Sequence, residues 1–142
     1  AAFTEALPAE GSYTFDFTFT SGETGTDTDI LTSEVIEPAV ITGCAYNAAE
    51  LGVVVTWDRP DGVDFFVVYL EDSRGEMVYV SKAPAGTKTS HVISAGEQYW
   101  YGTPDQGEIY TIIVGAFIYE PNKLDLNMQA KSMAAKTVTW GG

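Results

Sequence analysis

The chain has 142 residues, of which 45% are hydrophobic, and this is enough to bury the core of one domain. Its formal net charge is -13 at pH 7, and residues 1–58 contain ten Asp and Glu residues but no Lys or Arg. Such a surface repels phosphate groups, which argues against nucleic-acid binding. No apolar run reaches the roughly 18–20 residues that a membrane-spanning helix needs, so membrane insertion is not expected.

The N-terminal segment opens with a strictly alternating pattern at residues 12–20, in which polar residues separate four aromatic ones. Period-two alternation places these aromatic side chains on one face of a strand. The aromatic residues are Tyr13, Phe15, Phe17 and Phe19. A polar, glycine-containing stretch at 21–29 predicts a turn or loop, and 30–36 is a weaker candidate strand. We expect residues 1–36 to form a strand or hairpin that packs on the rest of the chain.

From residue 37 onward, short apolar segments recur between turn residues. The expected strands cover residues 39–46, 53–57, 65–70, 77–81, 89–93, 110–119 and 133–140. Turns every 8 to 12 residues between alternating strands are typical of an antiparallel sandwich or a barrel. Two connections, 94–109 and 120–132, are longer than the others, and the second is compatible with a helical turn at 124–131.

Three short motifs carry a resemblance to a known family. They are Val53-Val54-Val55-Thr56-Trp57 followed by Asp58-Arg59-Pro60-Asp61-Gly62, then Phe66-x-Val68-x-Leu70, then Pro104 to Tyr110 leading into Ile112-x-Val114-x-Ala116. In these motifs residues 38–140 resemble a fibronectin type III domain. The resemblance implies an all-β fold: an antiparallel β-sandwich at 37–142, with the early Trp and the late Tyr on opposite sheets, preceded by an N-terminal β extension at 1–36.

Two stretches depart from the family's pattern. Residues 94–103 look like an insertion, so either 89–93 or 98–101 is the strand that precedes the turn before Tyr110. Residues 1–36 have no counterpart in the family. Domains of this family serve as spacers, adhesion units or binding platforms on extracellular and cell-surface proteins, so the resemblance implies no reaction and no cofactor.

Alternation within two strands predicts an apolar outer surface. If the sets that begin at Phe66 and at Tyr110 face the core, the intervening side chains face outward. The outward residues are Phe65, Val67, Tyr69, Ile113, Phe117 and Tyr119. These strands are neighbours in the resembled fold, and each large side chain left in water forgoes roughly 1.5–3 kcal/mol. We expect this apolar surface to be covered by the N-terminal extension, by a second copy in a homodimer, or by a partner domain or ligand.

Several other residues are candidates for a site. Tyr99, Trp100 and Tyr101 lie in a long connection, where flat aromatic rings either stack on sugar rings or cap the end of the sandwich. His91 is the only histidine, and its position on the polar side of a short strand does not favour catalysis. Two groups of acids could supply oxygen ligands to a metal ion: Glu23, Asp27 and Asp29, and Asp58, Asp61 and Asp64. The first lacks the spacing of a calcium loop, and in the second Asp is a favoured turn residue, so no metal site and no catalytic residue is predicted.

The sequence therefore favours a non-enzymatic binding or adhesion module whose ligand is a carbohydrate or a protein. The alternative is a structural spacer, or an assembly subunit that associates through an apolar sheet face or a strand edge. Cys44 is the single cysteine, which rules out an internal disulfide. The chain begins with Ala1-Ala2 and no Met, which suggests a removed leader and an extracellular or cell-surface location, with a lipid anchor as one form of attachment.

Overall fold

A computed structural model describes residues 9–94, 101–119 and 128–142 of the chain. In these residues all the regular secondary structure is β-strand, and every strand pairing is antiparallel. The strands are β1 (Gly11–Thr18), β2 (Thr24–Leu31), β3 (Val40–Asn47), β4 (Gly52–Asp58), β5 (Phe65–Glu71), β6 (Met77–Val80), β7 (Ser90–Ser94), β8 (Ile109–Tyr119) and β9 (Met128–Thr139). The all-β prediction is confirmed.

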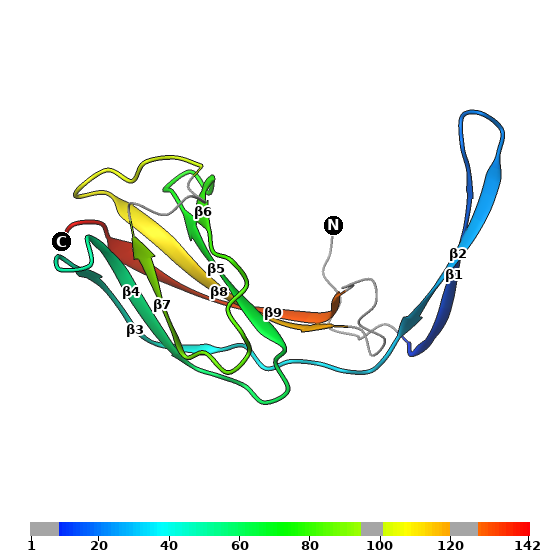
Figure 1. Cartoon of the computed structure of the whole chain (residues 1–142), viewed down its shortest axis with the longest axis horizontal. Coiled ribbons are helices and arrows are strands. Elements are labelled where there is room, and N and C mark those ends of the chain that lie inside the picture. Colours follow the sequence, from blue (N-terminus) through cyan, green and yellow to red (C-terminus); the bar gives the residue numbers. More distant parts are fainter. Residues whose placement is uncertain (1–8, 95–100, 120–127) are drawn as a thin grey trace. The chain divides into compact units, whose positions relative to one another are not determined.

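The chain divides into two compact units, residues 1–35 and 36–142. The first contains a hairpin of β1 and β2. The second contains a three-stranded sheet of order β3-β4-β7 and a four-stranded sheet of order β6-β5-β8-β9, which face each other as two layers (Figure 1). That the extension packs on the sandwich stays a prediction.

The core of the second unit lies between the two sheets. Alternate residues of β4, β5 and β8 are buried, and Trp57 on β4 meets Phe66 on β5 with ring centroids 5.2 Å apart. The Trp and Tyr110 therefore lie on opposite sheets, as expected, with exposures of 1% and 5%. The core is composed of Ala39, Val53, Val55, Trp57, Phe66, Val68, Leu70, Tyr79, Ile93, Tyr110, Ile112, Val114, Ala116, Val138 and Trp140.

In the first unit, the loop predicted at 21–29 is wrong from residue 24 onward, because this stretch forms β2. Its threonines pair across the hairpin: the Thr26 hydroxyl donates to the Asp16 carboxylate at 2.7 Å, and the hydroxyls of Thr14 and Thr28 lie 3.4 Å apart. Cross-strand pairs of this kind stabilise a sheet, and the composition of a segment alone does not reveal that it will form them. The strand predicted at 30–36 is correspondingly limited to the end of β2.

The last strand is longer than predicted. β9 begins at Met128, so the helical turn expected at 124–131 is wrong for the last four of those residues, and 124–127 lie outside the described residues. The cause is pairing with β8, which continues across a bulge to Tyr119. Of the two alternatives for the strand before the Tyr110 turn, 89–93 matches β7, which pairs with β4, whereas most of 98–101 lies outside the described residues.

Candidate binding surfaces

Alternation in β5 sets Phe65, Val67 and Tyr69 on the side of the sheet that faces away from the core. The register pairs Phe65 with Phe117 and Tyr69 with Ile113, and directly paired residues share a face. The six predicted outward residues therefore lie on one face of the four-stranded sheet. We call it the outer sheet face; it consists of Phe65, Val67, Tyr69, Ile113, Phe117 and Tyr119, with Lys131 and Met133 of β9.

Three aromatic rings are stacked on the outer sheet face. The Phe65 ring lies parallel to that of Phe117, with centroids 4.8 Å apart, and against that of Tyr119, with centroids 4.6 Å apart. A glycine makes room for this stack, because a Cβ at Gly115 would lie 2.8 Å from the Phe117 ring. Phe117 is only 2% exposed, whereas the other five predicted residues are half-buried. The face thus covers part of its own apolar area, which the sequence did not predict.

Among the described residues, one cation, Lys131, lies over rings of the outer sheet face. Lys131 of β9 pairs with Phe117 of β8, and its Nζ lies 5.5 Å from the centroid of the Phe117 ring and 6.0 Å from that of Tyr69. An ammonium group at this distance from a ring face is attracted by the π electrons. Burial raises the pKa of the Tyr69 phenol, whose hydroxyl is neutral at physiological pH even without this shift. The outer sheet face is therefore apolar and aromatic, with one positive charge.

Of the aromatic triplet predicted to contact a ligand, Tyr99 and Trp100 lie outside the described residues. Tyr101 is described and its side chain is 75% exposed. Its backbone N–H donates to the Val78 carbonyl at 2.7 Å, which attaches this position to β6. Tyr101 thus offers an exposed ring next to the edge of the four-stranded sheet.

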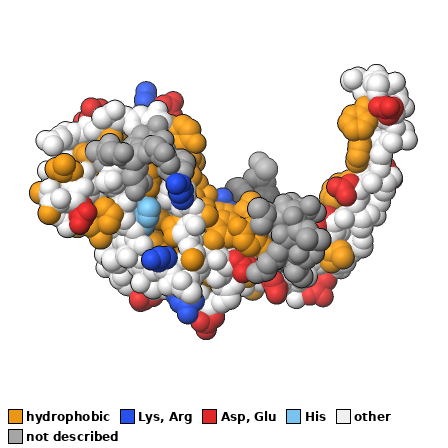
Figure 2. Space-filling view, in the orientation of Figure 1, with side chains coloured by type: hydrophobic (Ala, Val, Ile, Leu, Met, Phe, Trp, Pro, Cys, Tyr) orange, Lys and Arg blue, Asp and Glu red, His pale blue; other side chains and the backbone are white. Residues whose placement is uncertain are grey.

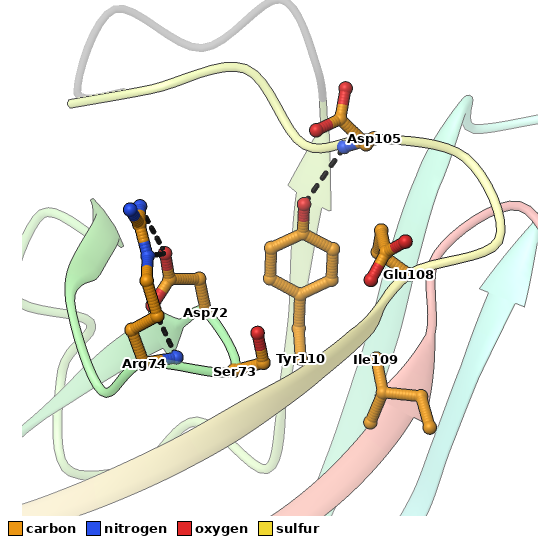
Figure 3. Close-up of a pocket in the computed structure, with 7 residues that line it drawn as sticks. All are labelled: Asp72, Ser73, Arg74, Asp105, Glu108, Ile109 and Tyr110. Atoms are coloured by element: carbon orange, nitrogen blue, oxygen red, sulfur yellow. Dashed lines mark hydrogen bonds and ion pairs between the residues drawn. The ribbon is translucent and has the colours of Figure 1, made fainter.

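A hollow of ≈ 200 Å³ lies at one end of the sandwich, between the turn after β5 and the segment before β8 (Figure 3). The turn is fixed by Asp72, whose carboxylate accepts hydrogen bonds from the backbone N–H groups of Glu76 and Arg74, each at 2.9 Å, and from the Arg74 guanidinium. The Glu76 hydrogen bond and then the Arg74 contacts lower the pKa of Asp72. These partners account for Asp72 and Arg74 as turn residues.

The other wall of the hollow contains Tyr110, whose hydroxyl accepts a hydrogen bond from the backbone N–H of Asp105 at 2.8 Å (Figure 3). A tyrosine near the start of a strand that bonds back to the backbone a few residues upstream is the tyrosine corner of sandwich domains. This hydrogen bond therefore stabilises the tight turn expected before Tyr110. We assign this hollow to the architecture of the sandwich.

Replacement of Tyr110 with Phe is expected to lower the free energy of unfolding by about 1 kcal/mol, because the buried Tyr110 loses its partly buried hydrogen bond to the Asp105 N–H. Urea denaturation measures the change. The matched control is Tyr101→Phe, which removes a hydroxyl from an exposed side chain and should leave stability unchanged. Equal effects of the two substitutions would contradict the role assigned to the Tyr110 hydroxyl.

Two further candidate residues, His91 and Asp64, form contacts within the fold. The Nε2 of His91 lies 2.6 Å from the hydroxyl of the buried Tyr79, a contact that joins β7 to β6. An Asp64 carboxylate oxygen accepts from the backbone N–H of Tyr119 at 2.9 Å. Within the described residues no three His, Cys, Asp or Glu side chains are grouped so that they could hold a metal ion.

Cys44 on β3 is half-buried against the core, and this burial raises the pKa of its thiol above that of an exposed cysteine, an effect that Lys136 partly offsets. Since the thiolate is the nucleophile, the native chain should react with iodoacetamide more slowly than the chain in urea near neutral pH. The native rate should keep rising at pH values where the rate of the unfolded chain has levelled off, and Lys136→Gln should slow the native reaction further. Equal rates in the native and unfolded chains would contradict this prediction.

Comparison with known proteins gives no family: no protein-family model matches the chain, and no curated protein is significantly similar to it in sequence. No part of the described chain forms a helix with the length and apolarity needed to cross a membrane. Sequence reasoning missed two features that bear on binding, namely β2 and the position of Lys131. The alternation of threonine with other residues at 24–30 was a usable signal for β2, but nothing local indicated which strand Lys131 would pair with.

Proposed function

We propose that the chain is a non-enzymatic binding module of the extracellular or cell-surface kind, and that its sandwich, which we take to be of the fibronectin type III kind, binds protein through the outer sheet face. The observation that carries the proposal is the set of half-buried apolar side chains on one face of β5 and β8. Antiparallel sheets with a solvated face normally present polar residues there. The tyrosine corner and the order of strands in the two sheets support the family assignment.

The chemistry of the outer sheet face favours a protein ligand over a sugar. A sugar site needs several convergent hydrogen-bonding groups around an aromatic platform. The outer sheet face as defined above offers the hydroxyls of Tyr69 and Tyr119 and the ammonium of Lys131, and its other side chains are apolar. An apolar, aromatic surface with few polar groups resembles the centre of a protein–protein interface.

The partner that the face fits is a second copy of the chain. Among the outward residues of β5, β8 and β9, two are charged: Lys131, which is paired with Phe117, and Glu71, which lies at the opposite end of β5 from Phe65. In a twofold dimer with the two faces in contact and the β5 strands antiparallel, the end that carries Lys131 meets the end that carries Glu71. The net charge of -13 opposes association, but it is screened beyond about 8 Å at physiological ionic strength.

Sedimentation equilibrium tests this proposal. We expect the wild-type chain to associate reversibly as concentration rises, and Ile113→Lys to remain monomeric, because a charge would be buried at the centre of the interface. The matched control is Val54→Lys, which places the same charge on the outward side of β4 in the other sheet. A wild-type chain that is monomeric at every concentration, or equal effects of the two variants, would refute the proposal.

A second candidate function is carbohydrate binding at the aromatic triplet. The observation that favours it is the 75% exposure of Tyr101, an aromatic ring whose backbone is anchored to β6. Stacking of a sugar on such a ring excludes water from both apolar faces. Binding on a glycan array that is lost in Tyr101→Ala and kept in Ile113→Lys would support it, and binding unaffected by Tyr101→Ala would exclude this residue from the site.

A further inference from the structure

The hairpin of the first unit has two unlike faces. The register pairs Tyr13 with Asp29, Phe15 with Asp27 and Phe17 with Gly25, so the aromatic side chains of β1 share a face with two carboxylates of β2. Figure 2 shows hydrophobic and acidic side chains along the hairpin. We call the surface formed by Tyr13, Phe15, Phe17, Asp27 and Asp29 the aromatic–acidic face. The opposite face consists mainly of threonines that hydrogen-bond across the strands.

The rings of the aromatic–acidic face are held in place while remaining open to solvent. The Phe17 ring lies over Gly25, where an added Cβ would be 2.5 Å from the ring, and it meets Phe19 edge-on at 5.3 Å between centroids. The Tyr13 hydroxyl donates to the Ala9 carbonyl at 2.6 Å. Even so, Tyr13, Phe15 and Phe17 are 40%, 57% and 43% exposed. Ordered aromatic rings at this exposure are typical of a surface that is covered in a complex.

The hairpin also has an edge along β2 that no described strand pairs with. There the carboxylates of Asp27 and Asp29 accept hydrogen bonds from the backbone N–H groups of Thr28 and Ile30 at 2.9 and 2.8 Å, contacts that an added strand would replace. In the described sheet β2 pairs with β1 on one side only, and its eight residues pair without a bulge. A long regular edge is a template for a further strand, and a two-stranded hairpin is only marginally stable in water by itself. A third strand along β2 would bring its side chains directly beside Asp27 and Asp29 on the shared face.

The charge of the first unit decides what such a strand must carry. Residues 1–35 contain seven Asp and Glu residues and no Lys or Arg. Two hairpins of this composition repel each other, so a second copy does not fit on this face. Asp27 and Asp29 are two positions apart on one face of a strand, and bases at alternate positions of an added strand have the same spacing. Long basic side chains there can pair with the carboxylates and reach the rings of β1.

We propose that the aromatic–acidic face of the hairpin binds an extended protein segment that has Lys or Arg at alternate positions and adds to β2 as a third strand. This role is separate from that of the outer sheet face: the residues lie in the other unit, and the required partner is basic. The mode is strand addition, in which backbone hydrogen bonds supply affinity and the alternate side chains supply specificity.

Titration of the full chain with acetyl-Lys-Val-Lys-Val-Lys-Val-Lys-amide, followed by calorimetry or amide NMR shifts, tests the proposal. We expect binding that shifts the amide signals of β2. The same lysines and valines in blocks, as Lys-Lys-Lys-Lys-Val-Val-Val, should bind at least about tenfold more weakly, because blocked lysines cannot all lie on one face of a strand. A peptide with Glu in place of Lys should not bind.

Two matched double variants locate the site. Asp27→Asn with Asp29→Asn should weaken binding of the alternating peptide by about tenfold, because two ion pairs are lost. Glu50→Gln with Asp58→Asn changes the net charge equally but alters exposed residues of the second unit, and it should weaken binding less. Phe15→Ser should also weaken binding, since this ring is the most exposed of the three on β1.

If the alternating and block peptides bound equally, net charge alone would explain the binding, and the proposal would be overturned. So would equal losses in the two double variants, or no binding of the alternating peptide. Self-association that Phe15→Ser abolishes, without peptide binding, would identify a second copy as the occupant and would likewise overturn it. None of these results depends on Ile113→Lys, which tests the outer sheet face.

Discussion

Replacement of Trp57 with Ala is expected to lower the free energy of unfolding by about 3–5 kcal/mol. Trp57 is 1% exposed, and its ring contacts Phe66 of the opposite sheet, so its removal leaves a cavity between the two layers. The cost combines the lost transfer free energy with the cavity that the rigid sheets cannot close. Urea denaturation followed by circular dichroism measures the change.

Trp57→Phe should cost less than Trp57→Ala for a specific reason besides size. The indole N–H of Trp57 is buried and finds no acceptor among the described residues, and Phe removes this unsatisfied donor. The control is Val40→Ala on β3, a 62% exposed position where the same method should show a change below about 0.5 kcal/mol. If Trp57→Ala unfolded at the same urea concentration as Val40→Ala, the core described between the sheets would be wrong.

Replacement of Gly52 with Ala is expected to lower the free energy of unfolding by about 2 kcal/mol. Gly52 begins β4 and pairs with Ser94 of β7, and a Cβ at this position would overlap the backbone carbonyl oxygen of Ile93. The obstacle is backbone, so no side-chain rotation relieves it and the two strands must move apart.

The matched control for Gly52 is Gly102→Ala, where the nearest atom to an added Cβ is a Val78 methyl carbon at 3.6 Å, an ordinary contact distance. Thermal denaturation should show a clear loss of stability for the first variant and little change for the second. The close approach of β4 and β7 at Gly52 would be contradicted if both alanine variants melted together with the wild-type chain.

The strands of the sandwich could be predicted because each carries its own period-two pattern. The alternation in β5 and β8 fixed which side chains face the core, and the structure places Phe66 and Tyr110 inside and Phe65 outside. β2 also alternates, with Thr at every second position from 24 to 28, but its Thr, Asp and Gly residues are equally typical of loops, so a loop was predicted there. What makes it a strand is pairing with β1, and this depends on residues six to twenty positions away.

The candidate surfaces were predicted only in part for a similar reason. Membership of the outer sheet face follows from alternation, but the stacking that buries Phe117 depends on the pairing of β5 with β8 and on the space above Gly115. The position of Lys131 over the rings depends on how far β9 extends along β8. Registers between distant strands are set by tertiary packing, and no local pattern in the sequence encodes them.

The association proposed for the outer sheet face has a direct test in double electron–electron resonance. A spin label is attached through Thr137→Cys, at the margin of the face, in a chain that also carries Cys44→Ala. The control label is attached through Ala49→Cys, in the turn between β3 and β4. We predict a defined distance between the labels of two copies at position 137, and its loss when Ile113→Lys is added. No coupling between copies at position 137, or coupling that Ile113→Lys leaves unchanged, would contradict the account.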